Sequence, residues 1–182
     1  MALRSTNEAK RMSESGTATF TDPDNYQAAI GVASVKPIVS GGVDFKARLT
    51  WLNLRHRQLL RGCENLPSIA FTSLPPARIF VSFPTSAAPL IWDGVELGLG
   101  DIVFHSRAER AHQRTTGESQ WGLVSLSPDW LAFFSHILIG RKITSPPVGR
   151  VLRPPWTTSR RLLRLHSKAC GLVETRGIVT LT

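Results

Sequence analysis

Short apolar stretches separated by turn residues fill the chain from residue 32 to residue 126, and within them apolar and polar positions alternate. In the stretch 43–61, Phe45, Ala47, Leu49 and Trp51 share one face of an extended chain. A period of two residues is typical of a β-strand with one buried face. Further strands are predicted at 78–83, on both sides of an Asp93-Gly94 hairpin turn, after a turn at 98–100, and at 119–126. Many short strands at this spacing favour a sandwich or small barrel over a parallel α/β sheet.

Helical spacing and capping residues appear at three places. Asp22 or Asp24 can cap a short helix that Pro23 begins and Gly31 ends. A second helix follows the last predicted strand, with Ser127 as N-cap, Pro128 at the first helical position and Gly140 as the stop.

A third helix is predicted over residues 158–174, after a proline-rich link. Its predicted apolar seam consists of Leu162, Leu165, Ala169 and Leu172. Its predicted basic face consists of Arg160, Arg161, Arg164 and Lys168. The sequence thus predicts a mainly β architecture: a flexible leader at 1–19, a barrel with a short N-terminal and a trailing helix at 20–140, and a basic linker with an amphipathic helix at 141–182.

Composition and charge narrow the class of protein. The 182 residues are 42% hydrophobic and 19% charged, enough to bury a core. Residues 1–140 carry 13 Lys or Arg and 12 Asp or Glu, whereas residues 141–182 carry nine Lys or Arg and one acid. The basic tail indicates an acidic partner such as a nucleic acid or, equally, a solvated helix face.

The chain has no apolar run long enough for a membrane span or a secretory signal. Cys63 and Cys170 lie far apart and lack metal-site spacing, so we expect separate, reduced thiols in a cytoplasmic protein.

One histidine position is a candidate for metal chemistry. His105, Glu109 and His112 contain the ligand types that suit iron or zinc. Residues four and seven apart do not converge on a strand without a special turn, so a hydrogen-bonded histidine with two polar neighbours is the simpler interpretation. No nucleophile elbow, zinc-protease motif or phosphate-binding loop is present. We therefore expect no enzyme activity, no cofactor and no bound metal.

Two basic segments have competing interpretations. The polar stretch 107–115 contains arginines that suit a carboxylate or phosphate ligand, but it equally fits an exposed hairpin. The helix at 158–174 most simply packs on its own barrel or on a second subunit. Contact between its arginines and a nucleic acid is the second interpretation, and a membrane surface is the weakest.

Several phrases of the sequence resemble one branch of the AraC/XylS-type transcription regulators. They are FTDPDNYQAAI, DFKARLTWLNL, HQRTTGESQWGLVSLSPDWLAFFSHILIGRKI and VLRPPWTTSRRLLRLHSKA, and together they cover roughly residues 20–170 in order. The resemblance is to the N-terminal region of those regulators. It implies a cupin-like barrel (a double-stranded β-helix or jelly roll) that senses an effector, followed by helices that join two subunits.

In the family, a pair of helix-turn-helix units follows these helices and reads DNA. This chain ends at Thr182 with no segment that predicts such units. The resemblance therefore implies a homodimeric sensing domain that binds a small molecule and contacts DNA only through a C-terminal domain absent from this sequence.

Inward positions of the predicted barrel are the candidates for effector contact. The candidates are Phe45, Trp51, Phe83, Trp92 and His105. Two hypotheses compete with the regulatory one: a stand-alone cupin metalloenzyme that uses His105 and His112, and a small basic protein that binds nucleic acid through the helix at 158–174.

Overall fold

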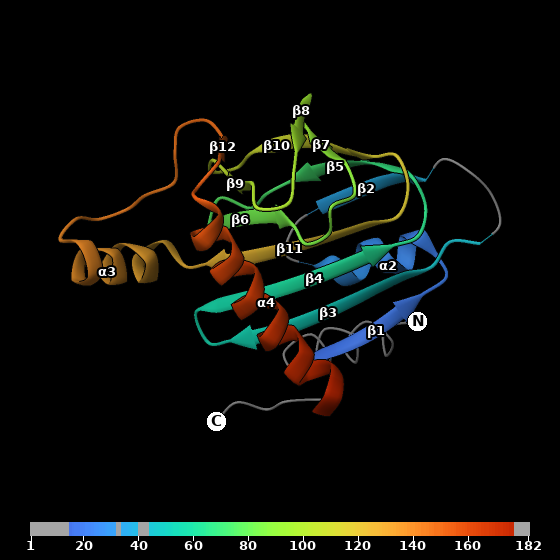
Figure 1. Ribbon diagram of the computed structural model, residues 1–182, viewed down its shortest axis with the longest axis horizontal. Coiled ribbons are helices and arrows are strands. Elements are labelled where there is room, and N and C mark those ends of the chain that lie inside the picture. The colour runs from blue at the N-terminus through green and yellow to red at the C-terminus, as the bar shows by residue number, and fades with distance from the viewer. Residues whose placement is uncertain (1–14, 32–33, 40–43, 177–182) are drawn as a thin grey trace.

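A computed structural model describes residues 15–31, 34–39 and 44–176 of the chain. Within these residues the strands form two antiparallel sheets (Figure 1). The larger sheet has the order β1-β3-β4-β11-β6-β9-β12. Its strands are β1 (Gly16–Phe20), β3 (Ala47–Leu54), β4 (Arg57–Glu64), β6 (Ile79–Pro84), β9 (Ile102–Phe104), β11 (Ser119–Leu126) and β12 (Arg150–Leu152).

The smaller sheet has five strands in the order β2-β5-β10-β7-β8. Its strands are β2 (Ser34–Val39), β5 (Ser68–Ser73), β7 (Leu90–Trp92), β8 (Val95–Leu97) and β10 (Arg110–Thr115). The two sheets lie face to face, and their inward side chains form the core. The predicted mainly β, cupin-like barrel is confirmed.

Three helices complete the described residues: α2 (Pro23–Ile30), α3 (Pro128–Ile139) and α4 (Trp156–Arg176). The Asp22 carboxylate accepts hydrogen bonds from two backbone N–H groups of the first turn of α2, and Gly31 ends that helix with a φ of 53°. Ser127 caps α3 in the same way, and Gly140 ends it with a φ of 71°. The predicted ends of both helices are therefore confirmed.

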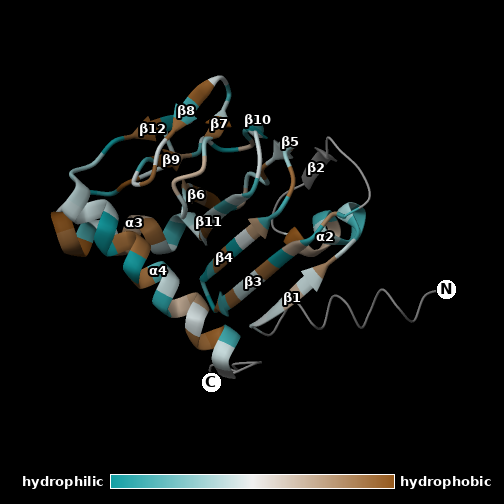
Figure 2. Ribbon diagram, turned by 45° about the vertical axis from the view of Figure 1, so that its right-hand side comes forward, coloured by the Kyte–Doolittle hydropathy of each residue, from teal (hydrophilic) through white to brown (hydrophobic). Residues whose placement is uncertain are grey.

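Helix α4 lies across the outer face of the larger sheet, whereas α3 projects from one end of the molecule (Figures 1 and 2). The stripe of α4 that packs on the sheet consists of buried side chains spaced seven, four and three residues apart, which places them on one face of the helix. They are Ser159, His166, Cys170 and Val173. The predicted apolar seam is not this stripe, because Leu165 is 54% exposed and Leu172 is 45% exposed.

Two predicted boundaries are wrong. Residues 16–19 of the predicted flexible leader, together with Phe20, form β1 and pair with β3, with Gly16 opposite Trp51. The remainder of that predicted leader, residues 1–14, lies outside the described residues. In the predicted basic linker, residues 150–152 form β12 and pair with β9. Both segments extend the larger sheet at its edges, where backbone groups of β3 and β9 need partners.

Candidate functional site

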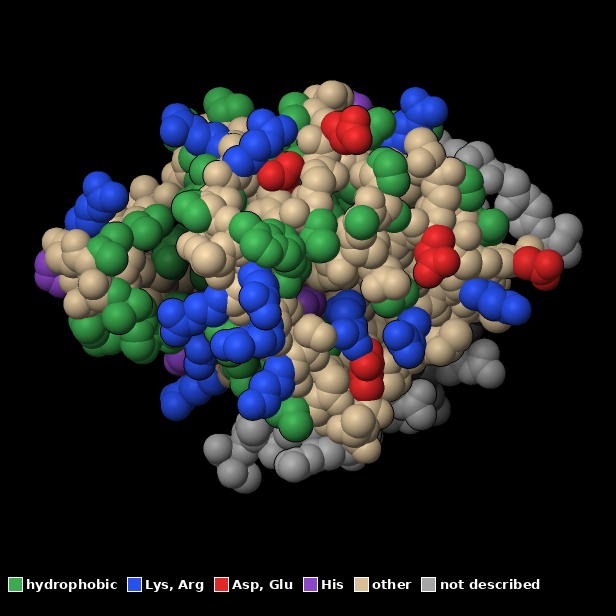
Figure 3. Space-filling model, in the orientation of Figure 1, with side chains coloured by type: hydrophobic (Ala, Val, Ile, Leu, Met, Phe, Trp, Pro, Cys, Tyr) green, Lys and Arg blue, Asp and Glu red, His purple; other side chains and the backbone are tan. Residues whose placement is uncertain are grey.

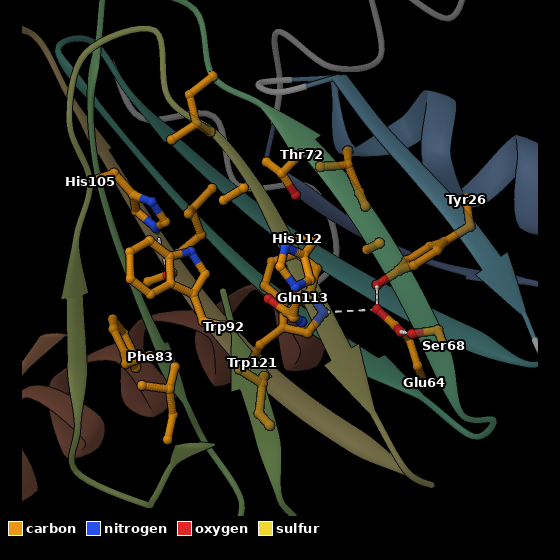
Figure 4. A pocket seen from close by; sticks show the side chains of 18 of the residues that line it. Tyr26, Glu64, Ser68, Thr72, Phe83, Trp92, His105, His112, Gln113 and Trp121 are labelled. Atoms are coloured by element: carbon orange, nitrogen blue, oxygen red, sulfur yellow. Dashed lines mark hydrogen bonds between the residues drawn. The ribbon is translucent and has the colours of Figure 1, made fainter. Parts of the chain in front are cut away.

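A cavity lies between the two sheets, inside the barrel (Figure 4). Its volume is about 90 Å³, and its wall is mostly apolar. Side chains reach it from both sheets and from α2. The strand register explains this, because residues that are directly opposite each other on paired strands point to the same side of a sheet. Leu123 lies opposite Ser82 on β6 and opposite Leu60 on β4, so all three point inward.

One end of the cavity is built around the carboxylate of Glu64. Its Oε1 accepts hydrogen bonds from the hydroxyl of Tyr26 at 3.0 Å and from Nε1 of Trp121 at 2.9 Å. Its Oε2 accepts a hydrogen bond from the hydroxyl of Ser68 at 3.3 Å. Three donors therefore compensate for removing this carboxylate from water. Burial, and then the neighbouring Glu64 carboxylate, raise the pKa of Tyr26 well above its ordinary value, so Tyr26 stays a neutral donor.

A second polar group of side chains lies at another part of the wall. Nδ1 of His105 and Oε1 of Glu109 are 2.8 Å apart, and Nε2 of His105 is 2.8 Å from Oγ of Ser82. Burial would raise the pKa of Glu109, but hydrogen bonds from His105 and from the backbone N–H of Ser106 outweigh it and lower that pKa. The carboxylate is therefore ionised at neutral pH and accepts from Nδ1–H of His105. In the neutral imidazole, Nε2 then accepts from the Ser82 hydroxyl.

The indole of Trp92 lies beside His105, edge to face, with 5.8 Å between the ring centroids. Figure 4 shows the two rings adjacent on one wall of the cavity, with the five-membered ring of the indole toward the other labelled side chains. Trp92 is only 9% exposed, and its Nε1 has no hydrogen-bond partner among the described residues. A buried donor without a partner is costly, so this group is notable in a cavity wall.

The structure separates the five predicted effector-contact residues. Phe45, Trp92 and His105 line the cavity. Phe83 also borders it, but its ring packs edge-on against His166 of α4 at a centroid distance of 5.0 Å. Trp51 is not part of the cavity wall, because its ring lies over Gly16 at the β1 edge of the sheet. Effector contact by these residues stays a prediction.

The three candidate metal ligands, His105, Glu109 and His112, do not converge on one point. His105 and Glu109 pair on the inside, whereas His112 lies opposite Phe71 on the outward face of the smaller sheet and its Nδ1 is 2.8 Å from the carboxylate of Asp93. Alternation along β10 causes the separation: Ala111 and Gln113 are half-buried and His112 is exposed, although part of His112 still borders the cavity. Among the described residues, no group of three or more His, Cys, Asp or Glu side chains is placed to hold a metal ion.

The same alternation directs the arginines of β10 away from the cavity. Arg110 and Arg114 are exposed on the outward face, and Nε of Arg107 donates to the carbonyl of Pro76. These guanidinium groups therefore do not line the cavity between the sheets, whereas Arg110 borders a second, more open pocket together with Phe71, Asp93 and His112. Gln113 and Ala111 occupy the inward positions instead.

Sequence reasoning missed Tyr26, Glu64, Ser68 and Trp121. A partial signal was present, because Leu60, Gly62 and Glu64 alternate in phase on one strand and so place an acid at an inward position. The three donors come from α2, β5 and β11, and nothing local in the sequence brings those elements together.

On the outer face of the larger sheet, the face away from the cavity, polar contacts hold α4. Nε2–H of His166 donates to the carbonyl of Leu60 at 2.9 Å, and the carboxylate of Glu174 forms an ion pair with Arg61. The hydroxyl of Thr50 also donates to Glu174, at 2.7 Å. Ser159 donates to the carbonyl of Gly100 at 2.8 Å near the start of the helix. These contacts anchor α4 to β3, β4 and the loop before β9.

The chain shares its fold with an AraC-like transcriptional activator. The solved structure of the activator CuxR aligns over 92% of this chain and 72% of its own, with a TM-score of 0.53 and 15% sequence identity. The resemblance predicted from the sequence is thus confirmed at the level of the fold.

Two other solved structures are similar at a lower level. The EutQ protein of Clostridium difficile is 10% identical, with a TM-score of 0.35 over 63% of this chain and 98% of that chain. The Ylba protein of E. coli is 11% identical, with a TM-score of 0.37 over 76% of this chain and 52% of that chain. No protein-family model and no curated protein sequence matches the chain. In the part of the chain that the structure describes, no helix combines the length and the apolar character needed to cross a membrane.

Proposed function

We propose that this chain is the effector-sensing and dimerisation part of an AraC-type transcription regulator and acts without catalysis. The observation that carries the proposal is that β4 and β11 serve the cavity on one face and α4 on the other. On β4, Glu64 lines the cavity and Arg61 holds Glu174 of α4. On β11, Trp121 lines the cavity, while Gly122 faces Phe83 and His166 beneath the helix.

A ligand that shifts the inward side chains of β4 and β11 therefore also shifts their outward side chains, on which α4 packs, because both sets belong to the same strands. Protein interiors are close-packed, so a displacement of Trp121 or Leu123 moves the neighbouring residues as well. This is the arrangement that an effector needs in order to change how a helix is presented to a partner.

The surface of α3 and α4 supports self-association. Leu165 and Leu172 of α4 are exposed, and on α3 Phe133, Ile137 and Leu138 are 60%, 59% and 77% exposed. Figure 3 shows hydrophobic side chains over α3 and Lys and Arg side chains gathered over α4. Large exposed apolar side chains on two consecutive helices are typical of an interface, and a two-fold axis would place the same surface on both subunits.

The test of dimerisation is sedimentation equilibrium on the whole chain and on a Leu165→Asp/Leu172→Asp double variant. We expect a wild-type dimer that the double substitution weakens at least tenfold, because it places charges in an apolar interface. Phe71→Asp is the matched control: Phe71 is 50% exposed on the smaller sheet, away from α4, and its substitution should leave the dimer intact. A monomeric wild-type chain, or a dimer insensitive to the double variant, would contradict the dimer interface.

One observation favours a second candidate function. Arg160, Arg161, Arg164 and Lys168 are all exposed on α4, as a phosphate-binding surface requires. In that case the chain alone binds duplex DNA with a steep dependence on salt concentration, and replacing the three arginines with glutamine removes most of that dependence. Tight sequence-specific binding by this chain would count against the regulatory proposal as stated, since it assigns base reading to another domain.

A further inference from the structure

We propose that the wall formed by Trp92 and His105 is a subsite for a hydrogen-bond acceptor of an uncharged, monocyclic aromatic ligand, and that Nε1–H of Trp92 is its donor. The inference rests on the proposed effector-sensing function and names the chemistry of the ligand that the cavity takes.

The donor is identified by its burial without a partner among the described residues, a combination that Thr72 and Gln113, which also line the cavity, do not share. Six buried side-chain nitrogen or oxygen atoms of the described residues lack a hydrogen-bond partner, and Nε1 of Trp92 is the one that belongs to a cavity-lining residue. The neighbouring imidazole of His105 is not free to serve, because Nδ1 is bonded to Glu109 and Nε2 to Ser82. At the other end of the cavity, Tyr26, Trp121 and Ser68 are already bonded to Glu64.

Trp92 is also held in place, which an oriented donor requires. The residue is only 9% exposed, and it packs with Leu90, Leu97 and Val103 in a core cluster. The edge-to-face contact with His105 fixes the ring on its other side. Nε1 is closed to solvent in the unliganded fold, so an acceptor reaches it when a neighbouring wall side chain shifts, and it then completes a hydrogen bond that the described residues leave unmade.

The charge of the wall sets the charge of the ligand. Among the described residues that line the cavity, none is Lys or Arg, and Glu64 contributes a carboxylate. An anionic ligand would enter an apolar space without a cation to pair with and with a carboxylate in the same wall. The ligand is therefore uncharged, with an acceptor such as a ketone, amide or ether oxygen.

The size and the apolar lining of the cavity determine the size and the hydrophobic character of the ligand. At about 30 Å³ of liquid volume per water molecule, a cavity of about 90 Å³ corresponds to roughly three waters, so one small ring is the largest ligand that it takes, and the wall must widen to admit it. Phe45, Leu74 and Leu123 supply apolar contact for such a ring.

The experiment compares two ligands that differ only in the acceptor: acetophenone and ethylbenzene, each titrated into the full chain by calorimetry. We expect acetophenone to bind about tenfold more tightly, which corresponds to one hydrogen bond to a buried donor. Trp92→Phe keeps an aromatic side chain without the donor, so in that variant the preference disappears while ethylbenzene still binds. Benzoate, which carries an acceptor but is anionic, should bind more weakly than acetophenone.

A second measurement needs no substitution at the site. In a ¹H–¹⁵N spectrum of the wild-type chain, acetophenone should move the indole N–H proton of Trp92 downfield, and ethylbenzene should not. This readout decides the question if Trp92→Phe fails to fold. Equal affinities for the two ligands, an unmoved Trp92 signal, or tighter binding of benzoate would overturn the subsite while leaving a ligand-binding cavity. Absence of binding by both neutral ligands would also overturn the subsite, and would leave the dimerisation test of the proposed function unaffected.

Discussion

Nε1–H of Trp121 donates to Oε1 of Glu64 across two paired strands, at 2.9 Å. The indole reaches the carboxylate because the residue opposite Trp121 on β4 is Gly62, which has no side chain to stand in its way. The same carboxylate oxygen accepts from Tyr26, so one inward acid ties α2, β4 and β11 together. Removing or crowding any member of this arrangement changes both stability and the shape of the cavity.

Glu64→Gln should lower the free energy of unfolding by about 1–3 kcal/mol. The amide that replaces the carboxylate turns an NH₂ group toward one of three donors, which then loses its acceptor. Urea denaturation at pH 7 measures the effect. Glu118→Gln, at an exposed position, is the control and should change stability by less than about 0.5 kcal/mol. Equal stability of the two variants would contradict a structural role for the Glu64 hydrogen bonds.

Gly122→Ala should loosen α4 from the sheet. A Cβ atom at position 122 would lie 2.5 Å from the ring of Phe83 and 2.9 Å from Cε1 of His166, so the helix must move or the strand must bend. Overpacking of this kind costs about 1–3 kcal/mol. Limited proteolysis should cut α4 faster in the variant than in the wild type. Gly117→Ala, where a Cβ would meet no atom within 4 Å, should leave the cleavage rate unchanged.

Stability should fall as the solution is made mildly acidic, because of His166. Burial between α4 and the larger sheet lowers the pKa of His166 below its ordinary value of 6.5; the hydrogen bond to Leu60 opposes this shift, and nearby Arg61 adds to it. The contribution of the neutral imidazole is therefore complete above pH 6.5 and is lost as the pH falls below that value toward the folded-state pKa. The slope can reach about 1.4 kcal/mol per pH unit.

Urea denaturation between pH 7.5 and pH 5 checks this slope. His166→Gln, which retains a donor for Leu60, should flatten it, and His136→Gln, at an exposed position of α3, should not. The carboxyls of Glu109 and Glu174 have lowered pKa values and act below their ordinary 4.5, outside this window. A slope that persists in His166→Gln would assign the pH dependence to another group.

The two thiols should differ sharply in reactivity. Cys170 lies on the buried face of α4 and is fully buried. Burial raises the pKa of its thiol to about 11, so its thiolate is scarce at neutral pH. Cys63 is partly exposed, and both cysteines are free. Ellman's reagent at pH 8 should label one thiol quickly and the second only after unfolding, and Cys63→Ser should abolish the fast phase. Fast labelling of Cys170 in the folded chain would show that α4 detaches readily.

The local features of the fold followed from residue types. Asp22, Ser127 and Gly140 mark helix ends because capping depends on side chains within a few residues. The Asp93-Gly94 turn is confirmed, with a φ of 44° and 81° at its two residues, as a hairpin of this length demands. The strand at 119–126 also has its predicted bounds. The inward phase of Phe45 and Trp92 came from simple alternation.

Helical spacing alone could not predict which face of α4 is buried against the sheet. The seam through Leu165 and the stripe through His166 are neighbouring faces of one helix, and hydrophobicity favours the first. The structure buries the second, because small or hydrogen-bonding residues let the helix approach the sheet and give His166 the carbonyl of Leu60. That carbonyl is 106 residues away in sequence, and its availability depends on the finished sheet.

Residue type and spacing thus determined the ends of α2 and α3, the Asp93-Gly94 turn, the strand at 119–126 and the alternation of side chains in β3, since these depend on interactions over a few residues. They did not determine β1 and β12, which form only by pairing with β3 and β9. The pairing of β5 with β10, the donors around Glu64, the separation of His112 from His105 and the exposed face of α4 were decided only when distant segments met. Burial and hydrogen-bond satisfaction are properties of that assembled neighbourhood, so the cavity and its unpaired donor at Trp92 exist only in the tertiary structure.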